Sequence, residues 1–386
     1  MKILHCCLAN FYIDGYGYQE NILPKMHKIQ GHEVSILAST ETYIDSKKIG
    51  YVGPSSYYTE SGIPITRVPY KRILPHFIMR KLRIYSGVTE VLYSFKPDII
   101  FIHGLQFISI IDIVDYVSNN PETKIYVDGH ADYINSAKNW ISKNILHGII
   151  YKWCAKKIEP YTQKFYGVLP ARVEFFKSMY GISKEKVELL VMGLDDSSID
   201  FKNREKIRSA IRNKININED DFVLITGGKI DRRKNIHLLM QAVNELNISN
   251  IVLIIFGIPD DDIRSEFEEL LNYNHMRYIG WIKAEESSDY LMASDLAVFP
   301  GTHSVLWEQS IGLGLPCVFR KWEGFQHVDL GGNCAFIENE NVDEIKEVIM
   351  SIYNNPELYS EMLIVSTEQG IPNFSYCQIA KKAIEE

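Results

Sequence analysis

One stretch of the chain decides the fold: Gly228-Lys229-Ile230-Asp231-Arg232-Arg233-Lys234-Asn235. The apolar run at 222–225 predicts a buried strand, and a Gly-Gly turn then leads to a helix that starts near Asn235. The turn brings Lys229 and Lys234 to the helix start, where unpaired N–H groups favour an anion. Ligands of parallel α/β sheets bind beyond the carboxyl ends of the strands. The stretch therefore predicts a diphosphate site that includes Gly228.

A second stretch lies about eighty residues later and carries a carboxylate: His303-Ser304-Val305-Leu306-Trp307-Glu308. Its apolar neighbours predict that Glu308 is buried, where a carboxylate can accept hydrogen bonds from a ribose diol. The backbone N–H groups of Ser304 and Val305, at a predicted helix start, could hold the distal phosphate. The alternatives are a surface acid at Glu308 and a packing histidine at His303. Diphosphate and ribose together indicate a nucleotide.

The bulk composition limits the classes of protein. A chain of 386 residues suggests two domains with good cores. The net charge of −8 argues against general nucleic-acid binding. Residues 1–197 carry 23 Lys and Arg against 19 Asp and Glu, whereas the remainder carries 18 against 30. The basic first part therefore favours an anionic membrane surface or a lipid-phosphate acceptor.

Apolar strand-like runs alternate with helical patterns in both halves of the chain. Continuous apolar strands separated by helices are typical of parallel sheets covered on both faces, so the chain is predicted to be α/β with two doubly wound domains. A polar stretch from about 195 to 221 separates them, which places the domains at 1–197 and 198–373. The predicted strands are 3–8, 34–37, 99–102, 125–127, 223–225, 251–256, 276–279, 296–299 and 317–319.

Several kinds of segment and site are not expected. No apolar run is long enough to span a membrane, and residues 1–8 predict a first strand rather than a signal peptide. The six cysteines have no CxxC spacing, which favours a reduced, cytoplasmic protein without structural zinc. The acidic run at 260–262 is interpreted as a solvated helix start. We expect no metal and no cofactor.

The order and spacing of the motifs resemble the retaining, GT-B-fold glycosyltransferases of the GT4 family (glycosyltransferase group 1). The subgroup that it resembles builds bacterial capsule, O-antigen or related surface glycans. The resemblance covers nearly the whole chain and rests on segments 1–5, 31–34, 97–100, 192–195 and 222–340.

The resemblance implies two Rossmann-like domains that face across a cleft, with a helix at 374–386 that crosses back to the first. It implies metal-independent, retaining transfer of a sugar from a nucleoside-diphosphate donor to a hydroxyl of a glycan, with an acceptor carried on a polyprenyl diphosphate. Lys229 and Lys234 would neutralise the leaving diphosphate. Glu308 would bind the ribose, and His130, after the strand at 125–127, would face the sugar.

The chain departs from the family pattern at three positions. The first cation, usually Arg, is Lys229, which keeps the charge but loses the bidentate fork. The first of two glutamates spaced eight residues apart is absent, because Pro300 stands there. A glycine is replaced by His303. We expect His303 and Ser304 to contact the sugar or the phosphate in place of the missing glutamate.

Other candidate residues follow predicted strands. Gly15 and Gly17, in the first loop, would let the backbone approach phosphate or acceptor; the alternative is an ordinary turn, and a third glycine of the dinucleotide fingerprint is missing. His103 is a further candidate, or a histidine that satisfies local backbone groups. In the family, the turn that holds Trp281 and Ile282 lies against the nucleobase; Trp281 as a core residue is the equal alternative.

A basic segment interleaves cations with large apolar residues at 70–85. Such a surface can lie on anionic lipid at the inner face of the plasma membrane. The alternative is a solvated helix with a core stripe. The cations proposed for this surface are Lys71, Arg72, Arg80, Lys81 and Arg83.

Two alternatives to glycosyl transfer stay open. One is a sugar-nucleotide 2-epimerase on the same fold, and the other is a non-catalytic scaffold in a glycan-assembly complex. The missing glutamate at Pro300 favours the scaffold, whereas the Lys229/Lys234 spacing and the Glu308 block favour transfer.

Overall fold

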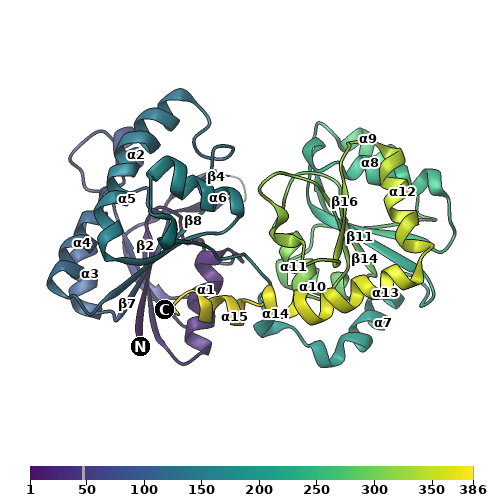
Figure 1. The fold of residues 1–386 in the computed structure, drawn as a ribbon, viewed down its shortest axis with the longest axis horizontal. Coiled ribbons are helices and arrows are strands. Elements are labelled where there is room, and N and C mark those ends of the chain that lie inside the picture. Colours follow the sequence, from purple (N-terminus) through teal and green to yellow (C-terminus); the bar gives the residue numbers. More distant parts are fainter. Residues whose placement is uncertain (46–47, 386) are drawn as a thin grey trace. The chain divides into compact units, whose positions relative to one another are not determined.

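The computed structural model describes residues 1–45 and 48–385. The chain forms two compact units, residues 1–191 with 379–386, and residues 192–378 (Figure 1). The first boundary thus falls at Val191 rather than at 197, and the second at Gln378 rather than at 373.

The first unit is built on an eight-stranded sheet of order β10-β9-β8-β7-β1-β2-β6-β5. All neighbouring strands are parallel except β5 and β6. Its strands are β1 (Lys2–Cys7), β2 (Glu33–Ser39), β5 (Ser55–Tyr58), β6 (Pro64–Val68), β7 (Ile99–His103), β8 (Lys124–Gly129), β9 (Thr162–Gly167) and β10 (Val187–Leu189), with a separate hairpin of β3 (Glu41–Asp45) and β4 (Lys48–Tyr51).

Helices cover this sheet, and apolar side chains of the strands form the core beneath them. The α-helices are α1 (Gln19–Ile29), α2 (His76–Leu82), α3 (Val88–Phe95), α4 (Ile110–Asn119), α5 (Lys152–Ile158) and α6 (Pro170–Phe175). A π-helix at Ser142–Tyr151 leads directly into α5. The last helix of the chain, α15 (Tyr376–Lys382), begins in the second unit and ends in the first.

The second unit is built on a six-stranded, fully parallel sheet of order β13-β12-β11-β14-β15-β16. Its strands are β11 (Phe222–Ile230), β12 (Ile251–Pro259), β13 (Met276–Gly280), β14 (Leu296–Phe299), β15 (Cys317–Arg320) and β16 (Cys334–Ile337). Its helices are α7 (Arg204–Lys214), α8 (Ile236–Leu246), α9 (Arg264–Leu270), α10 (Ala284–Met292), α11 (Leu306–Gly312), α12 (Val342–Tyr353), α13 (Pro356–Val365) and α14 (Ile371–Asn373).

Both sheets reverse their winding direction next to their first strand. In the first unit β2 lies on one side of β1 and β7 on the other, and in the second unit β12 and β14 flank β11 in the same way. Loops that leave such a switch point in opposite directions open a crevice at the carboxyl ends of the strands. The predicted parallel α/β architecture is confirmed for both units.

Buried ionic contacts stabilise the edge of the second sheet where β11 and β14 begin. The Arg212 side chain of α7 is fully buried and pairs with Asp295 at 2.8 Å, just before β14. It also donates to the carbonyls of Ala293, Asn218 and Asp221. The amino ends of β11 and β14 are therefore held together, while their carboxyl ends remain for a ligand.

No helix in the described ranges is both long and apolar enough to cross a bilayer.

Candidate functional site

A small pocket lies at the switch point of the second sheet, between the loops that follow β11 and β14. Two of its glycines are required by close approach. A Cβ on Gly227 would come 2.6 Å from the Phe256 ring, and one on Gly301 would come 2.3 Å from the backbone of Lys234. The pocket is lined by Thr226, Gly227, Lys234, Ile236, Phe299, Gly301, Thr302 and Ser304.

The predicted Gly-Gly turn lies elsewhere than expected. Strand β11 does not end at residue 225 but pairs with β12 through Ile230. Gly228 stays in that ladder with φ of +97°, which a side-chain-bearing residue rarely adopts. The turn follows at 231–235, where the Asp231 carboxylate accepts from the Arg233 N–H and Asn235 is the N-cap of α8. The prediction of a helix near Asn235 is confirmed.

Lys229 and Lys234 differ in their surroundings. Lys229 is half exposed, and its Nζ lies 2.7 Å from Asp260 and 3.4 Å from Asp231. Lys234 lines the pocket, and its Nζ donates to the carbonyls of Thr302 and His303, both at 2.8 Å. Burial lowers the pKa of Lys234 to about 8, so an anion that restores its charge is favoured there. Lys234 can therefore bind an anion directly, whereas Lys229 must first break its ion pair with Asp260.

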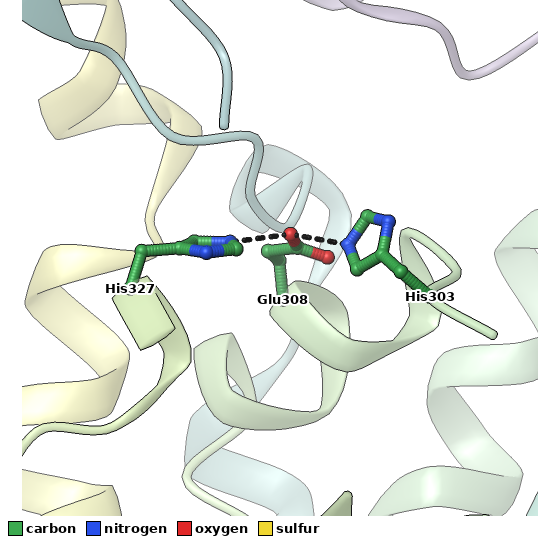
Figure 2. Close-up of side chains that lie close together, drawn as sticks. All are labelled: His303, Glu308 and His327. Carbon is green, nitrogen blue, oxygen red and sulfur yellow. Dashed lines mark hydrogen bonds and ion pairs between the residues drawn. The ribbon is translucent and has the colours of Figure 1, made fainter. Parts of the chain in front are cut away.

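Glu308 lies on α11 and is fully buried. Its Oε1 accepts hydrogen bonds from His303 Nε2 and His327 Nε2, each at 2.8 Å (Figure 2). Burial opposes ionisation of Glu308, but the two imidazoles outweigh burial and lower its pKa to about 2. The other oxygen, Oε2, is buried and has no hydrogen-bond partner among the described residues. The site therefore holds an ionised carboxylate with one oxygen available for a donor.

Aromatic packing fixes the helix that carries Glu308. The neighbouring Trp307 is fully buried and stacks on Phe319 of β15 with ring centroids 4.4 Å apart. The predicted residues before it also take part: Ser304 lines the pocket, and Val305 lies at the N-cap of α11. His303 connects the two halves of the site, because its carbonyl accepts from Lys234 and its ring donates to Glu308.

The same three side chains could hold a divalent cation. The ligand atoms of His303, Glu308 and His327 all lie within 4.8 Å of one another. Two imidazoles and a carboxylate are a donor set that zinc accepts. A bound ion would use both Nε2 lone pairs and so replace both hydrogen bonds to Glu308. The absence of a metal stays a prediction.

His130 belongs to the first unit and follows β8. Its Nε2 lies 3.8 Å from both Glu20 Oε1 and Asp128 Oδ2, beyond hydrogen-bonding distance, and the side chain is about one-fifth exposed. Asp132 has another role, since its carboxylate accepts from the N–H groups of Ile134 and Asn135. Glu20 and Asp128 are therefore the carboxylates that lie beside the His130 ring.

The remaining predicted binding residues vary in exposure. Gly15 and Gly17 lie in the loop after β1, and the space where a Cβ would stand is open at both. Ile282 is half-buried, and Trp281, after β13, is 67% exposed, so the interpretation of Trp281 as a core residue is wrong. His103 is fully buried and hydrogen-bonded within the first unit.

The basic segment at 70–85 is only partly helical, since α2 spans just His76–Leu82. Lys71, Arg72, Arg80 and Lys81 are exposed, as a surface for lipid requires. Arg83 is different: it donates to the Gln106 carbonyl and its guanidinium lies over the Phe11 ring. Arg83 therefore packs inward and does not extend the basic surface.

Sequence reasoning missed two residues of this site, His327 and Asp260. His327 lies on a short 3-10 helix after β15, and no spacing links it to Glu308. The one available signal was topological, because loops after neighbouring parallel strands meet at one edge of the sheet. Asp260 was interpreted as a solvated helix start, but it follows β12 and pairs with Lys229.

Part of the second unit is similar to a known protein family. Residues 207–364 match the family model of glycosyl transferases group 1, and this range includes Lys229, Lys234, His303, Glu308 and His327. No curated protein sequence matches the chain.

Solved structures match almost the whole chain. HepE from Anabaena, in complex with UDP and glucose, has a TM-score of 0.64 at 14% identity and covers 99% of this chain and 98% of its own. WaaG, a glycosyltransferase involved in lipopolysaccharide biosynthesis, has a TM-score of 0.63 at 16% identity, with coverage of 99% and 98%. A putative UDP-N-acetylglucosamine 2-epimerase from Listeria monocytogenes has a TM-score of 0.61 at 11% identity, with coverage of 99% and 94%. These likenesses confirm the GT-B fold with two Rossmann-like units.

Proposed function

We propose that this protein is a nucleotide-sugar-dependent glycosyltransferase whose donor site is the pocket of the second unit. The observation that carries the proposal is the buried, ionised Glu308, which has one oxygen without a partner and is joined through His303 to the cationic Lys234. A buried acceptor without a donor costs about 1–3 kcal/mol, which a bound hydroxyl pair relieves. The family match over 207–364 supports the same activity.

In this proposal each side chain has one task. Lys234, joined by Lys229 after it leaves Asp260, balances the charge that grows on the diphosphate as the sugar departs. Glu308 accepts hydrogen bonds from the ribose diol. Retention of configuration, the contact of His130 with the sugar, and independence from a metal are implied by the resemblance and belong to the proposal.

The test measures product and binding together. The protein is incubated with nucleotide sugars of uridine, guanosine, adenosine and cytidine and with glycan acceptors, and transfer is followed by mass spectrometry. A mass increase of one sugar on an acceptor supports transfer. Lys234→Met should remove both binding and transfer, whereas Lys346→Met, which removes a lysine that pairs with Glu245 and Asp343 on the surface, should keep both.

Two other outcomes separate the alternatives. Release of an epimerised sugar nucleotide without acceptor would favour an epimerase, like the putative 2-epimerase from Listeria monocytogenes among the structural neighbours. Binding of a nucleotide sugar without any product would favour a scaffold. If none of these nucleotide sugars binds, the proposed donor site is wrong.

We further propose a lipid-linked acceptor and contact with the inner face of the plasma membrane. The exposed cations of the segment 70–81 support it, and so does a second feature, on the helix that ends in α5. Ile141, Ile145, Ile149 and Trp153 recur every fourth residue and are 61%, 39%, 63% and 44% exposed. Lys143, Lys152, Lys156 and Lys157 lie among them.

Vesicle binding tests this surface. Sedimentation with anionic vesicles should retain the protein, and Ile149→Ser with Trp153→Ser should reduce retention at least fivefold. Retention on neutral vesicles to the same extent, or no effect of the two substitutions, would contradict the proposed surface.

A further inference from the structure

Three buried histidines of the first unit form one continuous hydrogen-bonded chain. His103 Nδ1 lies 2.7 Å from Asp128 Oδ2, and His103 Nε2 lies 3.0 Å from His5 Nδ1. His5 Nε2 lies 3.0 Å from His27 Nδ1, and His27 Nε2 lies 2.8 Å from the carbonyl oxygen of Ala380. All three rings and Asp128 are fully buried. The chain thus runs from the end of β8, across β7, β1 and α1, to α15.

Counting hydrogens fixes the protonation state of this chain. It contains four hydrogen bonds, and each needs one hydrogen. A neutral imidazole carries one N–H, so three neutral rings supply only three. Both ends of the chain, the Asp128 carboxylate and the Ala380 carbonyl, can only accept. One further proton is therefore needed, shared among Asp128 and the three rings.

The extra proton also makes the buried group electrically neutral. Without it, the carboxylate would leave one uncompensated negative charge in the core, which is costly. Burial disfavours a charged His103, but the Asp128 carboxylate outweighs burial and raises the His103 pKa above 6.5. Burial lowers the pKa of His5, and lowers that of His27 to about 4. The proton thus resides on His103, next to the carboxylate.

Other titratable groups surround the chain. Glu20 of α1 and His130 after β8 lie near Asp128, together with Cys7 of β1. His32, after α1, packs edge-on against His27 with ring centroids 6.0 Å apart. Glu20 favours the extra proton on His103, whereas His32 opposes charge on His27.

Loss of the extra proton affects the two ends unequally. With three hydrogens left for four contacts, one pair of acceptors must face each other. A carboxylate holds its donor more strongly than a carbonyl does. The hydrogens therefore shift toward Asp128, and the contact that loses its hydrogen is the one between His27 and Ala380.

We propose that His27, His5, His103 and Asp128 form a proton-dependent latch that holds the C-terminal residues 379–385 on the first unit. This inference is independent of the proposed function. The latch is closed while the extra proton is bound and opens as the pH rises through the raised pKa of His103. A second contact of this segment does not open in that range: Tyr166 donates to the Lys382 carbonyl, and burial raises the Tyr166 pKa further above 10.

Hydrogen exchange of the full chain tests the latch. Protection factors of amides 379–385, which correct for faster intrinsic exchange at high pH, are compared between pH 6.5 and 9.5. The wild type should lose about tenfold in protection, as expected for one buried hydrogen bond. In His27→Gln the amide N–H of glutamine can donate to Ala380 at every pH, so protection should stay constant. His32→Gln is the matched control and should behave as the wild type.

Histidine NMR provides a measurement that needs no variant. With 15N-labelled histidine at pH 7, the wild type should show one buried imidazolium with both ring nitrogens protonated. That signal together with pH-dependent protection supports the latch. Three neutral buried rings at pH 7, or pH-independent protection in the wild type, would overturn the latch. A loss of protection at high pH in His27→Gln as large as that in the wild type would also overturn it.

Discussion

Each unit of this protein buries a carboxylate against histidines, but the two clusters differ in their hydrogen count. At Glu308 two rings make two hydrogen bonds, so neutral imidazoles suffice and the cluster keeps a negative charge. At Asp128 three rings and a carboxylate make four bonds, so an extra proton is needed and the cluster is neutral. Each carboxylate has one oxygen without a partner among the described residues.

This difference distinguishes the proposed donor site from the proposed latch. A negative cluster beside a pocket requires a hydrogen donor or a cation from outside the protein. A neutral cluster that ends on a backbone carbonyl is already satisfied along its length. Burial and residue type alone do not distinguish them, whereas the number of hydrogens does.

The largest expected effect comes from the cation next to the charged cluster. Lys234→Met should reduce nucleoside-diphosphate affinity at least 100-fold, because it removes the buried charge and frees the carbonyls of Thr302 and His303. Calorimetric titration measures the loss. Lys346→Met serves as the control, and an affinity within threefold of the wild type in Lys234→Met would place the phosphate elsewhere.

Replacing each carboxylate by its amide sharpens the comparison. Glu308→Gln should weaken nucleotide binding by about 10- to 100-fold, because the site loses a charged acceptor. Asp128→Asn should leave nucleotide affinity within about twofold, and residues 379–385 should stay protected at every pH, because the amide N–H can supply the fourth hydrogen of the chain. Equal losses of nucleotide affinity in both variants would contradict the assignment of the site to the second unit.

Acid should weaken the Glu308 cluster in a defined range. The pKa of Glu308 is lowered from 4.5 to about 2, so its contribution to stability is complete above pH 4.5 and is lost as the pH falls toward 2. The loss should approach about 3 kcal/mol. Chemical denaturation between pH 5 and 2.5 checks this, and the pH slope should be shallower in Glu308→Gln. An unchanged slope would show that Glu308 is not held ionised.

The smallest expected effect is a gain. Asp260→Asn removes the carboxylate that lies 2.7 Å from Lys229 Nζ, so Lys229 becomes available for the diphosphate. Affinity should rise about two- to fivefold. Asp261→Asn, next to it and paired with Arg264, should change nothing. A lower affinity in Asp260→Asn would mean that Asp260 positions Lys229 for the ligand.

The sequence predicted β1, β2, β7 and β8 of the first sheet and every strand of the second sheet except β16, because these buried strands are continuous apolar runs; the inner parallel strands β6 and β9 were not predicted. Edge strands such as β5, β10 and β16 were missed, since they are short and partly exposed. Lys229, Lys234 and Glu308 were predicted as site residues from local patterns at strand and helix ends. The contact of Lys229 with Asp260 was not predicted.

The two histidine clusters were largely invisible in the sequence. In the chain, His27 lies 22 residues after His5, and His103 lies 98 residues after His5. Only the strand order brings the three histidines together. His327 meets Glu308 for the same reason. Isolated histidines carry no pattern, so such contacts follow from topology rather than from spacing.

The central claim is that Glu308 accepts hydrogen bonds from a ribose diol. A double-mutant cycle by calorimetry tests it with the nucleoside diphosphate that binds best and its 2′,3′-dideoxy form, each titrated into wild type and Glu308→Gln. Loss of the diol should cost at least tenfold in the wild type and less than threefold in Glu308→Gln. An equal cost in both proteins would contradict the claim.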